Sequence, residues 1–126
     1  MTRFVADDPE RYRGQTIGTG HCVPFVHRAA GTPPSAHWRR GPKVRDGGLT
    51  KGTAIATFTA QGRYASATDG SSHAAILIAD NSDGLLVWDQ WVGRPVNQRV
   101  IRFRNGVGDA VNDGDQYYAI EAVSTG

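Results

Sequence analysis

The apolar residues of this chain are mostly β-branched, and this limits the folds that it can adopt. Eleven valines and six isoleucines stand against four leucines and one methionine. β-Branched side chains lose rotamer freedom in helices and pack well on pleated sheets, so strands should outnumber helices. A length of 126 residues suits one ordinary domain, and we expect a single domain over residues 1–126.

Five segments with alternating or continuous apolar residues are predicted to be strands. Asn81-Ser82-Asp83-Gly84 predicts a tight turn that joins the second and third strands into a hairpin. The polar segment 59–72 predicts a long loop of the kind that often borders a binding site. Residues 1–20 show no sustained periodicity and are predicted to be irregular. The predicted strands are 52–58, 73–79, 85–91, 98–104 and 117–123.

One clear helix is predicted, over residues 22–31. Pro24 falls in its first turn, where a missing N–H does little harm, and Gly31 provides a C-terminal stop. A further helical turn, capped by a serine, is predicted over residues 35–40. A helix followed by a strand-rich antiparallel sheet predicts the α+β class.

Cys22 is the only cysteine of the chain and lies at the predicted start of this helix. The positive end of a helix stabilises a thiolate, and its backbone N–H groups can bind an oxyanion. Glycines in the preceding Gly18-Thr19-Gly20-His21 would let a substrate approach the sulfur. Cys22 also shares the core-facing side of the helix with Val26 and Ala29, so a buried, unreactive thiol is the alternative interpretation.

His73 and Asp89 lie on the two strands of the predicted hairpin. A turn centred near Asn81 would place them directly opposite each other, within reach of an imidazole–carboxylate hydrogen bond. A thiolate nucleophile requires such a base and an acceptor that orients it. A structural histidine and a solvated aspartate remain the alternatives, although a carboxylate next to Trp88 in an apolar strand requires a partner.

Composition and spacing argue against several other classes of protein. The net charge of +2 is too small to indicate nucleic-acid binding, and no apolar run is long enough for a membrane helix. The acidic N-terminus does not fit a signal peptide, so we expect synthesis in the cytoplasm. No HxxxH, CxxC or phosphate-loop spacing occurs, so neither metal nor cofactor is expected. Arg99, Arg102 and Arg104 are interpreted as a solvated edge strand.

Five sequence segments occur in a characteristic order: 20–26, 38–41, 52–58, 73–76 and 87–91, the last reading Val-Trp-Asp-Gln-Trp. Together they resemble the NlpC/P60 and CHAP-type cysteine amidases, and most closely the small type VI secretion amidase effectors. The resemblance implies a papain-like core, with a cysteine-bearing helix packed on an antiparallel sheet of about five strands. It implies Cys22 as nucleophile, His73 as base and Asp89 as third member, with Gln15 as the candidate oxyanion-hole residue.

The resemblance further implies hydrolysis of amide bonds in peptidoglycan stem peptides or cross-links by an antibacterial effector. Such a protein would leave the cell by type VI secretion or lysis, act in the periplasm of target cells and require a periplasmic inhibitor in its producer. Two alternatives stay open. One is a non-catalytic cell-wall binding module with Trp88 and Trp91 as a sugar platform; the other is a cysteine deamidase or acyltransferase that acts on a protein.

Overall fold

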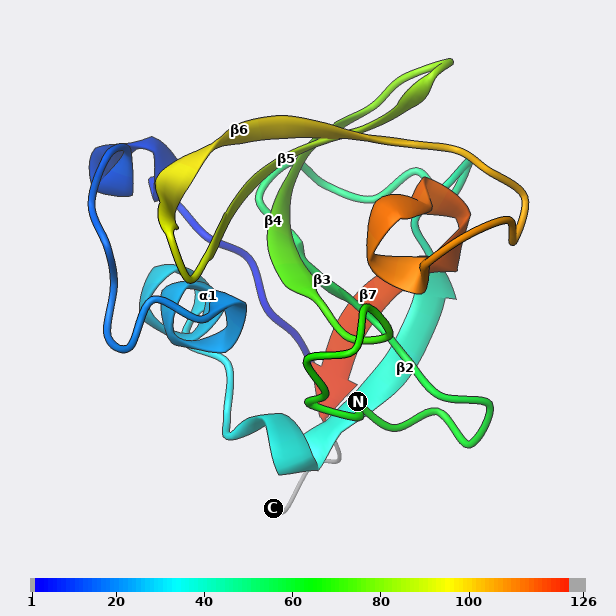
Figure 1. Ribbon diagram of the computed structural model, residues 1–126, viewed down its shortest axis with the longest axis horizontal. Coiled ribbons are helices and arrows are strands. Elements are labelled where there is room, and N and C mark those ends of the chain that lie inside the picture. Colours follow the sequence, from blue (N-terminus) through cyan, green and yellow to red (C-terminus); the bar gives the residue numbers. More distant parts are fainter. Residues whose placement is uncertain (1, 123–126) are drawn as a thin grey trace.

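An antiparallel sheet of seven strands, with an α-helix on one face, forms the centre of residues 2–122, which the computed structural model describes (Figure 1). The strand order is β1-β7-β3-β4-β5-β6, and β2 also pairs with β7. The predicted α+β class is therefore confirmed. The strands are β1 (Thr2–Arg3), β2 (Trp38–Lys43), β3 (Ala54–Thr57), β4 (Ala74–Asp80), β5 (Gly84–Trp91), β6 (Arg94–Arg102) and β7 (Tyr117–Ala122).

Helix α1 (Cys22–Ala30) begins at the cysteine, as the sequence predicts. Gly31 ends it in the left-handed conformation with φ of 71°, where its N–H donates to the His27 carbonyl. Phe25 and Val26 are fully buried and anchor the helix on the sheet. Short 3-10 helices occur at Pro9–Tyr12, Ser35–His37, Ala110–Asn112 and Gly114–Gln116.

The sheet has an apolar layer on each face. On the face that α1 covers, Phe25 and Val26 pack with Ile76 and Trp88. On the other face, β-branched and aromatic residues form a second cluster that includes Ile55, Leu77, Val87, Ile101 and Tyr117. Burial on both faces accounts for the nearly continuous apolar character of β3 to β5. Within the described residues, no helix is long and apolar enough to cross a membrane.

Three sequence predictions about secondary structure were wrong. The predicted helical turn at 35–40 is a 3-10 helix that stops at His37, and Trp38 begins strand β2. Trp38 is fully buried, so packing against the core overrides the capping signal of Ser35.

The N-terminal arm is not wholly irregular, because β1 pairs with β7. Strand β6 begins at Arg94, four residues before its predicted start, because it pairs along almost the whole of β5. The end of the predicted strand 117–123 lies outside the described residues.

Candidate active site

Cys22 is presented by a segment that is tied to the centre of the sheet. The buried side chain of Gln90 accepts a hydrogen bond from the Ile17 N–H (3.0 Å) and donates to the carbonyls of Ile17 (2.9 Å) and His21 (2.7 Å). Gly18 has a φ of 59°, and a Cβ there would lie 2.8 Å from Cβ of Pro24. The glycine therefore allows the chain to turn tightly into α1, which fixes the position of the thiol.

The backbone of His73, directly before β4, is held by Thr57 at the end of β3. The His73 N–H donates to Oγ1 of Thr57 (3.1 Å), and the Thr57 N–H donates to the His73 carbonyl (3.0 Å). The Thr57 hydroxyl in turn donates to the Ser71 carbonyl (3.0 Å), which ties down the loop before His73. The imidazole is thus carried by a rigid strand end.

The His73 ring is hydrogen-bonded to Asp89 of β5, with 2.8 Å between Nε2 and Oδ2. The sequence predicted that His73 and Asp89 lie directly opposite each other, and this register was wrong. Ile76 pairs with Trp88 and Leu77 with Val87, so His73 is displaced two residues from the position across from Asp89. A shift of two residues keeps both side chains on the same face of the sheet, where diagonal neighbours are within reach of long side chains.

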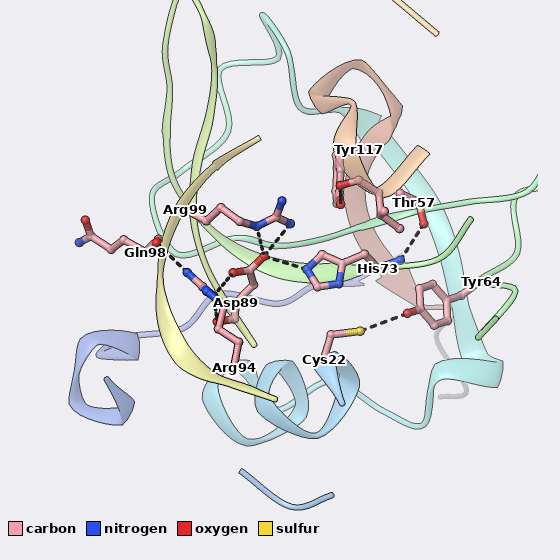
Figure 2. A network of polar contacts seen from close by, with 10 residues as sticks. Cys22, Thr57, Tyr64, His73, Asp89, Arg94, Gln98, Arg99 and Tyr117 are labelled. Atoms are coloured by element: carbon pink, nitrogen blue, oxygen red, sulfur yellow. Dashed lines mark hydrogen bonds and ion pairs between the residues drawn. The ribbon is translucent and has the colours of Figure 1, made fainter. Parts of the chain in front are cut away.

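Asp89 is completely buried and forms ion pairs with two arginines as well as with His73. Nη1 of Arg94 lies 3.0 Å from Oδ1, and Nε and Nη2 of Arg99 lie 2.9 and 2.8 Å from Oδ2 (Figure 2). The interpretation of Arg99 as solvated was therefore wrong, although β6 is an edge strand and Arg102 and Arg104 are exposed, as predicted. Arg99 pairs across from Val87 on β5, so its side chain lies on the same face as Asp89.

Tyr64, from the long loop between β3 and β4, contacts the nucleophile candidate. Its hydroxyl lies 3.5 Å from Sγ of Cys22, and its ring packs on Trp38 with 4.8 Å between centroids (Figure 2). Burial, and then the nearby Cys22 sulfur, raise the pKa of Tyr64 well above its usual value. The hydroxyl therefore keeps its proton and donates a hydrogen bond to a thiolate.

The pKa of Cys22 is lowered and that of His73 is raised, so each shift favours the charged form of its own group. Burial raises the pKa of the Cys22 thiol, but the neighbouring His73 and Tyr64 more than offset burial and lower it overall. Burial lowers the pKa of His73, but Asp89 and Cys22 outweigh burial and raise it to about 9. Burial also opposes ionisation of Asp89, yet His73 and Arg99 hold its pKa below the usual range. A thiolate–imidazolium pair backed by a carboxylate is the expected form near neutral pH.

A pocket of about 590 Å³ gives access to this group. Cys22 and His73 line it together with Tyr64, and Trp91 forms part of its wall with its ring 6.3 Å from that of His73. Among the described residues, no group of three or more potential metal-ligating side chains is present. The arrangement is suited to covalent catalysis by the thiolate.

The chain is similar to known amidase effectors. A family model described as domesticated amidase effector 2 matches residues 1–120. A protein of that name from Ixodes scapularis is 37% identical over 123 residues, covering 90% of this chain and 82% of the relative. The chain belongs to the domesticated amidase effector 2 family.

Two type VI secretion amidase effectors support the same assignment. A type VI secretion amidase effector 2 protein from Salmonella typhi is 32% identical over 94 residues, covering 70% of this chain and 69% of the relative. A solved structure of type 6 secretion amidase effector 2 superposes with a TM-score of 0.79 at 25% identity, covering 96% of both chains. The resemblance to small type VI secretion amidase effectors predicted from the sequence is thus confirmed.

The structure of this family member brings Cys22, His73 and Asp89 together at one end of the sheet, but it places two other candidates elsewhere. Gln15 is exposed and donates to the Arg11 carbonyl, outside the lining of the pocket. Trp88 is buried under the sheet face covered by α1, whereas Trp91 is 40% exposed at the pocket. The two tryptophans therefore do not share one face as a sugar platform.

Three residues of the site were not predicted as such from the sequence: Tyr64, Arg94 and Arg99. The length and polarity of the loop 59–72 mark it as a binding-site border, but nothing in the sequence distinguishes Tyr64 from its neighbours. Alternation along the hairpin of β5 and β6 would have placed Arg99 on the face of Asp89. A buried carboxylate in an apolar strand was the signal that called for such partners.

Proposed function

We propose that this chain is an NlpC/P60-like cysteine amidase, in one domain over residues 1–126, that hydrolyses amide bonds in peptidoglycan stem peptides or cross-links. The observation that carries the proposal is the His73 ring, which is bonded through Nε2 to the buried Asp89 and lies in one pocket with Cys22. Family membership supports amide hydrolysis as the reaction. The type VI effector relatives favour the bacterial cell wall as the target.

The first half of the reaction forms a thioester on Cys22. The thiolate attacks the amide carbonyl carbon, a C–S bond forms, and the carbonyl oxygen takes the negative charge. Nε2 of His73 is bonded to Asp89, which leaves Nδ1 to give its proton to the amide nitrogen as the C–N bond breaks (Figure 2). Asp89 fixes the tautomer and stabilises the imidazolium.

The second half of the reaction releases the acid. Nδ1 of His73 takes a proton from water, the resulting hydroxide attacks the thioester carbonyl, and the C–S bond breaks to regenerate the thiolate. We assign Tyr64 as a donor that holds the resting thiolate through its 3.5 Å contact with Sγ. Backbone N–H groups at the start of α1 stabilise the oxyanion in both halves.

The central experiment is mass spectrometry of peptidoglycan fragments after digestion. The wild-type protein is expected to produce pairs of new fragments whose masses add up to that of the uncut material plus one water. The folded Cys22→Ala variant is the matched control and should produce none. A wild-type digest that matches the Cys22→Ala digest would overturn the proposal.

The proposed effector role predicts dependence on compartment. Export to the periplasm of a Gram-negative cell should cause lysis, whereas expression in the cytoplasm should be harmless because the wall is absent there. An effector delivered by type VI secretion or lysis also requires a periplasmic inhibitor in its producer, and we expect that protein to cover the pocket of Cys22. Equal toxicity in both compartments would instead favour a deamidase or acyltransferase acting on a protein.

A further inference from the structure

A second pocket adjoins the first on the side of His73. It has a volume of about 260 Å³, and we call it the Arg99 pocket. His73 and Trp91 line both pockets, whereas Cys22 lines only the larger one. His73 therefore stands between the nucleophile and this second space. Its remaining wall includes Gly70, Arg99, Val111 and Asn112.

The place of the Arg99 pocket agrees with where a leaving amine must go. His73 gives its proton to the amide nitrogen, so that nitrogen must lie next to the imidazole when the bond breaks. The acyl side of the substrate stays bonded to Cys22 in the larger pocket. A residue that carries the leaving amine would therefore extend past His73, on the side where the Arg99 pocket lies.

Arg99 brings a positive charge to this space. Its side chain is 21% exposed, and its Nε and Nη2 both contact one oxygen of Asp89. A guanidinium has five N–H donors in a planar fork, so donors remain beyond those used on Asp89. The guanidinium also lies 5.1 Å from the centre of the Trp91 ring, which holds it at the pocket wall.

The charges around Asp89 do not cancel within the protein. With His73 protonated and Cys22 ionised, three positive groups face two negative ones, since Arg94 and Arg99 both pair with Asp89. The excess of one positive charge lies beside the pocket that would receive the leaving residue. A carboxylate is a ligand that a partly desolvated guanidinium binds strongly, through charge-assisted hydrogen bonds.

We propose that the Arg99 pocket binds the residue that carries the leaving amine and that Arg99 recognises a free carboxylate on that residue. The proposal rests on the proposed function, because it takes Cys22 and His73 as nucleophile and proton donor. The substrates it selects are peptides in which the amine side of the cut bond bears a carboxylate.

Arg94 provides the matched control. It also contacts Asp89, and it lies 4.5 Å from the Trp91 ring centre, but it does not line the Arg99 pocket. Its Nη2 donates to the Gln98 carbonyl (2.9 Å) and its Nη1 to the Asp89 carbonyl (3.2 Å). Arg94 thus supports Asp89 with donors that bind the protein itself. A role of Arg99 limited to neutralising Asp89 would make the two arginines behave alike.

The experiment compares kcat/KM for two versions of the stem peptide cut in the fragment analysis. They differ only on the amine side of the cut bond, where one has a free carboxylate and the other a carboxamide. A charge-assisted contact predicts that the wild type favours the carboxylate by about 10- to 100-fold, mostly through KM. Arg99→Gln should remove this preference, whereas Arg94→Gln should lower both rates and keep it.

Asn112→Asp is the second variant, in case Arg99→Gln fails to fold. Asn112 lies at the exposed edge of the Arg99 pocket, where an added negative charge should reduce the preference for the carboxylate. Equal wild-type rates on both peptides, or a preference that survives both Arg99→Gln and Asn112→Asp, would overturn the inference and leave the amidase proposal standing. A wild type that cuts neither peptide would overturn the proposed function and this inference together.

Discussion

Asp89 and Asp113 are both fully buried, but different kinds of donor hold them. Asp113 accepts backbone N–H groups of Arg104 (2.8 Å), Gly106 (2.6 Å) and Asp115 (2.9 Å), and so fixes the turns before β7. The carboxylate of Asp89 is instead hydrogen-bonded by side chains, those of His73, Arg94 and Arg99.

The difference separates a carboxyl group that holds a loop, Asp113, from one that stabilises the positive charge of a catalytic imidazole candidate, Asp89. Backbone donors do not titrate, so Asp113 maintains one loop geometry. The imidazole that contacts Asp89 does titrate, and it lines the pocket of Cys22. Buried charge paired with a titratable group in a pocket marks a functional site. We therefore expect substitutions at Asp89 to affect activity and those at Asp113 to affect stability.

The largest effects should come from the groups that Asp89 serves. Cys22→Ala and His73→Ala should each abolish hydrolysis, by about 10⁴-fold or more, because a nucleophile and its base act as a unit. The double variant should be no worse than either single one. Rates of peptide hydrolysis measure the loss of activity, and thermal denaturation curves of the same variants show whether they are folded. Full activity of a folded Cys22→Ala variant would disprove its role as nucleophile.

Asp89→Asn should give the next largest effect. Loss of the carboxylate allows the wrong His73 tautomer and destabilises the imidazolium, with an expected loss in kcat of up to about 10⁴-fold. The pKa of His73, raised to about 9 in the native protein, should fall, so the alkaline limb of the activity profile should move to lower pH. Asp89→Glu tests geometry, because it keeps the charge but displaces it by one methylene. Wild-type rates and an unchanged pH profile in Asp89→Asn would remove the contrast with Asp113.

Tyr64→Phe should have a smaller effect on activity. The variant keeps the ring that packs on Trp38 but removes the hydroxyl that contacts Sγ of Cys22. A loss of roughly tenfold in kcat/KM, with a raised thiol pKa, is expected for one hydrogen bond to a charged group. Steady-state kinetics with a pH titration of thiol reactivity measures both. An unchanged thiol pKa would show that Tyr64 does not stabilise the thiolate.

Asp113→Asn should leave activity nearly unchanged and lower stability. The NH₂ group of the new amide would face backbone N–H groups whose hydrogen bonds Asp113 now accepts, so both would be donors. A buried unsatisfied donor costs about 1–3 kcal/mol. Chemical denaturation measures the change in the free energy of unfolding, and Asp7→Asn provides an exposed control. A stable but inactive Asp113→Asn variant would contradict the structural role.

The local patterns of the sequence contained much of the fold and part of the site. Gly31 and the turn at 81–84 correctly predicted the end of α1 and the hairpin of β4 and β5. Alternation along that hairpin placed His73 and Asp89 on one face. The register was wrong by two residues because the turn is centred between Ser82 and Asp83 and not on Asn81. An irregularity between Leu77 and Ala79, which has no signal in the sequence, takes back one of the three residues of that displacement.

Contacts between distant segments could not be predicted in the same way. Gln90 binds Ile17 and His21 across 73 and 69 residues, and the contact of Tyr64 with Cys22 spans 42. Neither contact follows from a repeat period or a turn signal. They depend on how the loop 59–72 and the segment before α1 fold back on the sheet, which only tertiary packing decides.

Thiol reactivity as a function of pH tests most directly the claim that Asp89, through His73, prepares Cys22 for catalysis. Cys22 is the only cysteine, so its alkylation by iodoacetamide can be followed by mass alone. We predict rapid alkylation of the wild type near pH 6, since His73 lowers the thiol pKa, and a shift toward the ordinary value of about 8.5 in His73→Ala. A wild-type profile with the ordinary thiol pKa, identical to that of His73→Ala, would contradict the account.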